Sequence, residues 1–290
     1  MKRNLHLLII DPQNDFCDLP AEYRPNDPLA PTASLAPALP VPGAHADLLR
    51  VAQLIERGGA GLSDITVTLD SHHRLDVAHP TFWMKADGSP VEPFTPISAA
   101  QVRAGQYRPR SENSVERVLA YLDTLESSGR YGLFIWPVHC EIGSWGQNVH
   151  AAVRAAYNAW EERALGAVSK VAKGSNPWTE HYSAVMAEVP DPGDPGTQLN
   201  HSLIDSLARA DQVYITGEAG SHCVKATTEH IADNFVASDL SKLVLVTDCM
   251  SAVPGFEPQY EAFLRNMRER GLQTVPSSDV LPELIANGHR

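Results

Sequence analysis

Short apolar runs recur along this chain, and stretches with helical periodicity separate most of them. The runs have the length and composition of buried parallel strands. They are Leu5–Ile10, Ile65–Leu69, Tyr131–Trp136, Ala167–Val171, Gln212–Thr216 and Leu243–Val246. Helical periodicity marks Asp47–Arg57, Val149–Trp160, Ser202–Ala210, Val224–Phe235 and Gln259–Arg270. Because alternating strands and helices form βαβ units, we predict an α/β fold, a single three-layer α/β/α domain with a mostly parallel, Rossmann-like sheet of about six strands.

Three segments break this alternation, at about residues 19–43, 84–129 and 188–200. The first carries seven prolines, the second begins with a stretch rich in proline and glycine, and the third contains the turn cluster Pro190–Gly196. Long loops within a compact domain are often lids or binding loops. We therefore predict one domain over residues 1–290 that carries three long loop insertions.

The charge of the chain excludes several classes of function. Its formal net charge is −12, from 23 basic and 35 acidic residues, and no basic block stands out. Nucleic acids and anionic membranes need a basic surface, so neither is an expected partner. The first apolar run is too short for a signal peptide and ends at Asp11. We expect a cytoplasmic protein with a small-molecule substrate, and a homo-oligomer is left open.

Reactive side chains follow the predicted strands directly. In open α/β sheets, ligands bind beyond the carboxyl ends of the strands, so these side chains should meet at one edge. They are Asp11, Asp70, His72, His139, Cys140, Lys173, Glu218, Cys223, Asp248 and Cys249.

Cys223 is the candidate nucleophile among four cysteines that form no CxxC pair. It lies where a predicted strand turns into a helix, within Gly217–Val224. A helix N-terminus favours the thiolate, and its free N–H groups can stabilise an oxyanion. The alternative interpretation is a buried structural cysteine.

Asp11 and Lys173 are candidate partners for this thiol. A carboxylate near a thiol can take its proton and return it to a leaving amine. An ammonium group beside both would keep them ionised. Taken alone, Asp11 reads as a turn or cap residue and Lys173 as a surface lysine. Their position at neighbouring strand ends favours the catalytic interpretation.

A second group of residues suits a divalent cation. Asp70 and His72 lie on the same face of one extended segment, and His139 follows another predicted strand. One carboxylate with two or three imidazoles is a ligand set for zinc or iron. His79 is an additional candidate, whereas His73 should point the opposite way from His72.

Ordered sequence blocks resemble the nicotinamidase/pyrazinamidase branch of the isochorismatase-like cysteine hydrolases. The blocks are Leu8–Cys17, Val41–Ala44, Thr68–His72, Trp136–Cys140, Lys173–Pro177 with Tyr182–Ala184, and Ser221–Thr227. The resemblance implies a catalytic triad of Asp11, Lys173 and Cys223. It also implies an oxyanion hole formed by the N–H groups of Ala219, which follows a cis peptide in the family, and of Cys223.

The resemblance also implies ligands and pocket walls. The implied metal ligands are Asp70, His72 and His139, with His79 as a candidate fourth, and the ion is zinc first, with iron and manganese as alternatives. The implied walls that sandwich a flat ring are Phe16 and Trp136.

The activity that the resemblance implies is hydrolysis of a small aromatic amide by a cysteine amidohydrolase. Nicotinamide, converted to nicotinate and ammonia through a thioester as in NAD salvage, is the leading substrate. The alternatives are an amidase or carbamoyl hydrolase for another small substrate, a hydrolase in which the metal activates water, and a small-molecule-binding protein without activity.

Two features depart from the family pattern. The three insertions flank the expected pocket and make the chain longer than its relatives. Glu218 stands where the family more often has an apolar residue. A carboxylate there is either a contact for a basic residue or substrate, or a buried structural partner.

Overall fold

A six-stranded parallel sheet forms the centre of the computed structural model, which describes residues 2–235 and 239–290. The strand order is β12-β11-β10-β1-β4-β9. The strands are β1 (Leu5–Ile10), β4 (Asp64–Asp70), β9 (Ser169–Lys173), β10 (Gln212–Gly217), β11 (Leu243–Val246) and β12 (Gln273–Val275). Each neighbouring pair runs parallel, which confirms the predicted sheet type.

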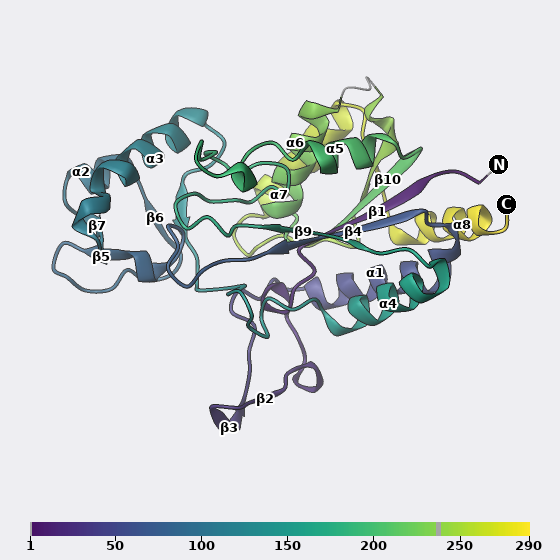
Figure 1. The fold of residues 1–290 in the computed structure, drawn as a ribbon, viewed down its shortest axis with the longest axis horizontal. Helices are drawn as coiled ribbons and strands as arrows, with labels where there is room; N and C mark the ends of the chain where they lie inside the picture. The colour runs from purple at the N-terminus through teal and green to yellow at the C-terminus, as the bar shows by residue number, and fades with distance from the viewer. Residues whose placement is uncertain (1, 236–238) are drawn as a thin grey trace.

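Helices cover both faces of this sheet. Below it in Figure 1 lie α1 (Ala44–Gly58) and α4 (Ala151–Ala164), and α8 (Ser277–Gly288) packs on α1. Above it lie α5 (His201–Ala208), α6 (Cys223–Asn234) and α7 (Glu257–Glu269). The central strands β1, β10 and β11 are buried along their whole length, because each of their faces meets a helical layer. The predicted α/β/α layering is therefore confirmed.

The prediction that Tyr131–Trp136 joins the central sheet is wrong. The strand in this segment is β8 (Leu133–Ile135), and it pairs antiparallel with β6 (Thr95–Ile97) outside the central sheet. An apolar run of this length does not specify which strand it pairs with. In the structure, β9 occupies the position beside β4. The sixth strand is instead β12, a short and partly exposed edge strand without a strong apolar pattern.

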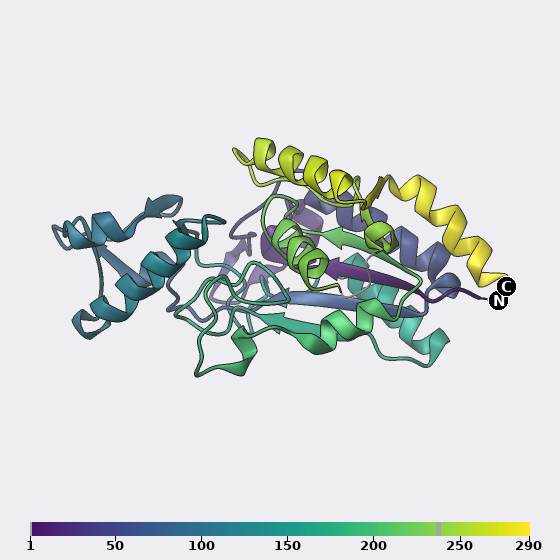
Figure 2. The ribbon, with the colours of Figure 1, turned by 90° about the horizontal axis from the view of Figure 1, so that it is seen from above.

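The segment predicted as a long loop insertion at 84–129 contains helices and strands of its own. This region, which we call the insertion lobe (residues 83–128), forms a separate layer of structure beyond the end of the sheet (Figure 2). Its elements are β5 (Trp83–Lys85), β6, α2 (Ala99–Arg103), β7 (Tyr107–Pro109) and α3 (Val115–Ser128). Helical periodicity was present in α3, where Val118, Leu122 and Leu125 are buried. The assignment of the whole chain to one domain stays a prediction.

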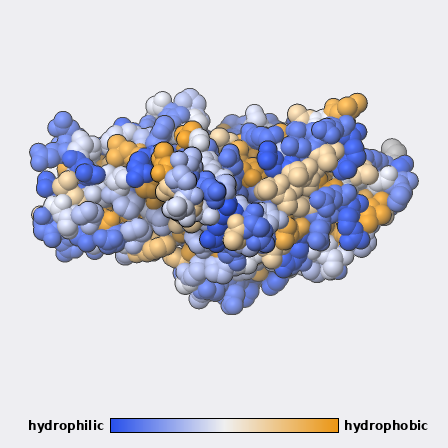
Figure 3. Space-filling view, turned by 90° about the horizontal axis from the view of Figure 1, so that it is seen from below, coloured by the Kyte–Doolittle hydropathy of each residue, from blue (hydrophilic) through white to orange (hydrophobic). Residues whose placement is uncertain are grey.

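The insertion at 19–43 projects from the molecule as a hairpin of β2 (Asn26–Asp27) and β3 (Ala30–Ser34), seen at the bottom of Figure 1. Leu29 at its turn is 93% exposed. Seen from below, hydrophobic residues are scattered among hydrophilic ones over the surface (Figure 3). None of the described helices has both the length and the apolar character needed to span a membrane.

The strand register brings the carboxyl ends of the central strands to the same level. Ile10 on β1 lies opposite Gly217 on β10, and Asp70 on β4 lies opposite Lys173 on β9. The residues that end or follow these strands therefore meet at one edge of the sheet. This edge carries the candidate site.

Candidate active site

Lys173 is the centre of a buried charge cluster at this edge. Its Nζ lies 2.9 Å from Asp11 Oδ2 and 2.9 Å from Asp70 Oδ1, and it donates to the His181 carbonyl at 3.0 Å. The Cys223 sulfur lies 3.7 Å from the same Nζ. The structure thus brings together the three residues predicted as a triad, from the ends of β1 and β9 and the first turn of α6.

Asp11 is held in one orientation by its neighbour Thr68. The Thr68 hydroxyl accepts from the Asp11 N–H at 3.0 Å and donates to the Asp11 carboxylate. The Asp11 backbone has a φ of 44°, which turns the chain sharply as it leaves β1. One carboxylate oxygen thus faces Thr68 and the other faces Lys173, within reach of the thiol.

The ionisation of the triad follows from its burial. Burial raises the pKa of the Cys223 thiol well above its usual value, although Lys173 acts in the opposite direction. Burial also raises the pKa of Asp11, again against Lys173. Burial alone would lower the pKa of Lys173, but Asp11 and Asp70 outweigh it and hold the pKa well above normal. The resting site therefore pairs a neutral thiol with a strengthened carboxylate base and a firmly protonated lysine.

Two backbone N–H groups near the thiol have no acceptor among the residues that the structure describes. They belong to Ala219 and Cys223. The peptide between Glu218 and Ala219 is cis, as the resemblance implies. Unpaired N–H groups beside a thiol can donate hydrogen bonds to a developing oxyanion.

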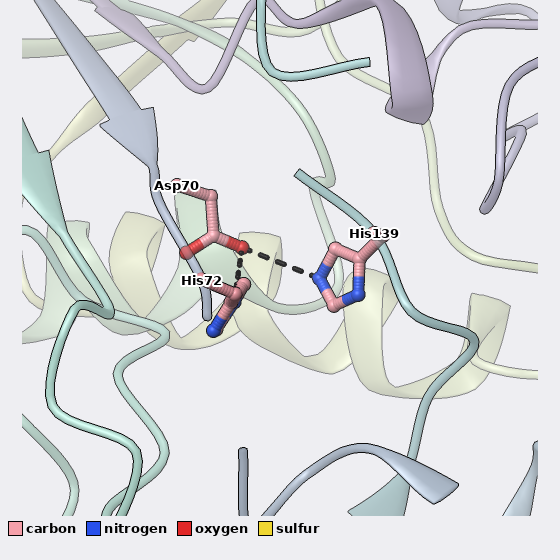
Figure 4. Close-up of side chains that lie close together, drawn as sticks. All are labelled: Asp70, His72 and His139. Carbon is pink, nitrogen blue, oxygen red and sulfur yellow. Dashed lines mark ion pairs between the residues drawn. The ribbon is translucent and has the colours of Figure 1, made fainter. Parts of the chain in front are cut away.

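Asp70 also faces two imidazoles (Figure 4). Its Oδ2 lies 3.0 Å from His72 Nε2 and 3.4 Å from His139 Nε2. Ligand atoms of these three buried residues lie within 4.8 Å of one another. Although Asp70 Oδ2 is this close, the buried His72 Nε2 forms no hydrogen bond with it or with any other residue that the structure describes. One carboxylate oxygen and two imidazole nitrogens that converge in this way fit a divalent cation.

Outer residues fix the orientation of this cluster. The Gln13 side chain accepts from the Asp70 N–H and donates to the Asp70 carbonyl, both at 2.7 Å. Asp76 Oδ2 lies 3.2 Å from His72 Nδ1, so the other nitrogen of that ring is turned toward Asp70. The Pro137 carbonyl lies 2.8 Å from His139 Nδ1, so Nε2 of that ring is turned toward Asp70.

His79 lies close to the cluster, but its ring nitrogen faces His139 rather than Asp70. Its Nε2 lies 3.3 Å from Nδ1 of His139, the nitrogen that faces away from Asp70. Burial lowers the pKa of His79 to about 3, so this ring is neutral. Its role as a fourth ligand stays a prediction.

A cavity of about 20 Å³ lies between the thiol and the imidazole cluster. Phe16 and Trp136 both line it, where the resemblance expects walls for a flat ring. A space of this size holds about one water molecule. Tyr182 and His222 line both this cavity and a neighbouring pocket of about 360 Å³, so both side chains lie at the boundary between the two spaces.

Glu180 is a residue of this cavity that the sequence analysis missed. It is buried, its Oε1 accepts from the His181 N–H at 2.9 Å, and its Oε2 has no hydrogen-bond partner within residues 2–235 and 239–290. Burial raises its pKa to about 7. Glu180 lies in a turn-rich segment between Lys173 and Tyr182, where no strand end signals a functional position.

Comparisons with known proteins find similar folds among solved structures. No family model and no curated protein sequence matches the chain. Among solved structures, the yeast nicotinamidase bound to the inhibitor nicotinaldehyde has a TM-score of 0.61 at 18% identity, with 94% of this chain and 99% of that chain covered.

Two further solved structures have a similar fold. An Acinetobacter baumanii nicotinamidase/pyrazinamidase has a TM-score of 0.58 at 18% identity and covers 96% of this chain and 99% of its own. The pyrazinamidase of Pyrococcus horikoshii in complex with zinc has a TM-score of 0.52 at 18% identity, covering 94% and 99%. The chain therefore has the fold of these proteins, as the ordered sequence blocks predicted.

Proposed function

We propose that this chain is a cysteine amidohydrolase that acts on a small aromatic or heteroaromatic amide, with nicotinamide as the leading substrate. The observation that carries the proposal is the contact of Lys173 with Asp11, Asp70 and Cys223 beside two unpaired N–H groups. The likeness to two nicotinamidases and a pyrazinamidase supports the substrate class. With nicotinamide as substrate, the reaction would serve NAD salvage, and the cytoplasm is the location that we propose.

Acylation begins with transfer of the Cys223 proton to Asp11. The sulfur attacks the amide carbonyl carbon, and the carbonyl oxygen, now negative, accepts from the N–H groups of Ala219 and Cys223. When the C–N bond breaks, Asp11 returns the proton to the leaving nitrogen, and ammonia departs. Lys173 stays protonated throughout and stabilises the negative charges of the thiolate and of Asp11.

Deacylation repeats these steps with water. Asp11 takes a proton from a water molecule that attacks the thioester carbon, and the same two N–H groups stabilise the oxyanion. The C–S bond then breaks, the carboxylic acid is released, and Asp11 returns the proton to the Cys223 sulfur. The cycle needs no group beyond the triad, the N–H groups and water.

Asp70, His72 and His139 would hold a divalent cation, because their ligand atoms converge in a buried site. A bound cation of this type supplies an electrophilic ligand position for a ring nitrogen of the substrate, which would orient the ring. Zinc is the proposed ion, since the Pyrococcus horikoshii pyrazinamidase is in complex with zinc, and iron and manganese are alternatives. The protein residues themselves orient the cluster through Gln13 and Asp76.

A second substrate candidate is an amide larger than nicotinamide. The neighbouring pocket of about 360 Å³ shares Tyr182 and His222 with the small cavity and is lined partly by residues next to the insertion lobe, including Leu133 and Phe134. A substituent on the ring could occupy this pocket once His222 moves. This observation favours a substituted aromatic amide over any substrate without a ring.

Ammonia release from a panel of amides tests the proposed function. We expect release from nicotinamide or from a substituted aromatic amide, and none from a primary amide without a ring, because the cavity walls are aromatic. Release should be measured with a coupled ammonia assay at millimolar substrate. Release from the aliphatic amides alone would contradict the proposed substrate class, and no release from any amide would contradict the amidase proposal.

The metal site gives a second expected result. The purified protein should contain about one divalent metal ion per chain, and His72→Ala should reduce this content at least tenfold, because it removes a buried ligand. His73→Ala is the matched control, since His73 is the next residue and is exposed. Metal content measured by mass spectrometry is independent of activity. Equal metal content in the two variants would exclude this site.

A further inference from the structure

We propose that Glu218 is a positioning residue for this reaction, because its buried carboxyl group, joined to Asp47 through Ser251, holds the Ala219 N–H where the oxyanion forms. This inference rests on the proposed function and adds a residue to it. Glu218 does not line the cavity, so it would act through the backbone that follows it.

Ser251 links the two carboxyl groups. Its N–H donates to Glu218 Oε2 at 3.1 Å, and its hydroxyl donates to Asp47 Oδ2 at 2.5 Å. Glu218 comes from the loop after β10, Asp47 from the first turn of α1, and Ser251 from the loop after β11. Three elements distant in sequence are therefore tied together at one point beneath the candidate oxyanion hole.

The surroundings of Glu218 favour the protonated form of its carboxyl group. Glu218 is fully buried, and its Oε1 has no hydrogen-bond partner in the part of the chain that the structure describes. Arg50 contacts Asp47 and Asp248, but it makes no ion pair with Glu218. Two adjacent buried carboxyl groups cannot both be charged at low cost, and a proton on Glu218 can be donated to Asp47. Burial and Asp47 hold the pKa of Glu218 well above its usual range.

The loop that contains Ser251 also holds the backbone on each side of Ala219. The Gly217 N–H donates to the Cys249 carbonyl at 2.9 Å, and the Gly220 N–H donates to the Ser251 carbonyl at 2.7 Å. The Glu218 N–H donates to the Ile10 carbonyl at 2.8 Å. Every N–H from Gly217 to Gly220 therefore has an acceptor except that of Ala219. The Glu218 side chain adds the contact that fixes residue 218 itself to residue 251.

Two substitutions separate positioning from packing. Glu218→Gln stays neutral and keeps a donor and an acceptor, so most of kcat should be retained. Glu218→Leu has a similar volume but neither polar atom, so kcat should fall about 10-fold to 100-fold with little change in KM, because a displaced oxyanion donor costs about that much. If the side chain only fills space, the leucine variant will match the wild type and the proposal is wrong.

A reaction that does not use the oxyanion hole is the internal control. Iodoacetamide alkylates the Cys223 sulfur with loss of iodide, and no oxyanion forms, so its rate should be the same in the leucine variant and the wild type. An aromatic aldehyde adds to the same sulfur and converts its carbonyl oxygen to a hemithioacetal oxyanion. Its affinity should fall in the leucine variant by about the factor lost in kcat. Equal aldehyde affinity in the leucine variant and the wild type would overturn the proposal. This test holds even if the wild type shows no amidase activity.

The pH profile gives a third readout. As pH rises, Glu218 ionises beside Asp47, the carboxyl pair repels, and wild-type kcat should fall. The glutamine variant lacks this group and should keep its kcat to higher pH. The other titratable or charged groups that face the pair are Asp18, Asp248, Arg50, Cys17, Cys249 and Tyr260. These groups remain in both proteins, so a difference between the two pH profiles reports the ionisation of Glu218. Identical profiles would contradict the proposal that Glu218 acts in its protonated form.

Discussion

Replacement of Cys223 by alanine should reduce ammonia release by at least about 10³-fold, because Cys223 supplies the sulfur that forms the proposed thioester. The Cys223 sulfur lies 3.7 Å from Lys173 Nζ, at the start of α6 and beside the small cavity. Substrate should still bind to this variant, since the aromatic walls and the imidazole cluster remain. Steady-state kinetics and calorimetric binding of a substrate amide measure the two effects separately.

Cys17→Ala is the matched control for this substitution. Cys17 is also a buried free thiol, but its sulfur donates to the Gln13 carbonyl and does not contact Lys173. Full activity of Cys223→Ala would exclude the thiol mechanism and favour water activated at Asp70, His72 and His139. A wild type that binds aromatic amides tightly and releases no ammonia would favour a binding protein.

Replacement of Lys173 by methionine should remove activity to a similar extent and also destabilise the fold. Lys173 is 1% exposed and contacts two buried carboxylates at 2.9 Å. Loss of the cation leaves these charges unpaired, which costs about 3–5 kcal/mol of unfolding free energy. Urea unfolding followed by circular dichroism measures the loss.

This destabilisation should grow with pH. Without Lys173, the pKa of Asp11 loses its main lowering influence, while burial still raises it. A carboxyl group with a raised pKa in the folded state favours folding when protonated, so its penalty is small below about pH 4. The penalty increases as pH rises from the unfolded pKa through the folded one. Unfolding free energies of the variant at pH 5 and pH 8 should therefore differ more than those of the wild type.

Lys170→Met on the same strand is the control. Lys170 is 44% exposed and lies 3.8 Å from Glu161, so its charge is solvated. We expect little change in activity or in unfolding free energy, as for other exposed ion pairs. An equal loss in both variants would show that the effect of Lys173→Met comes from β9 as a whole rather than from the buried cation.

Sequence patterns predicted the elements that depend on local periodicity. The central strand β1 and the helices α1 and α6 follow from apolar runs and helical stripes, because buried parallel strands are apolar on both faces. The same patterns did not identify β12 or place β8, since a three-residue strand carries too little periodicity to specify its neighbour. The helix α3 had a readable stripe, but the proline-rich stretch before it obscured that signal.

The residues of the candidate site were also only partly predictable from the sequence. Residue type and strand-end position identified Asp11, Lys173 and Cys223, together with Asp70, His72 and His139, because parallel strands deliver their carboxyl ends to one edge. Local sequence carries no signal for Glu180, whose unpaired oxygen is known only from the side chains around it. The direction of the His79 ring likewise depends on His139.

The sequence by itself determined which reactive groups this protein has and that they would meet at one end of a parallel sheet. Only the tertiary structure decided how they share charge. Lys173 bonds to two carboxylates at once, and Glu218 shares Ser251 with Asp47 from another helix. Pairing of buried charges depends on distances of a few ångströms between segments far apart in the chain, and no local pattern of residues encodes such distances.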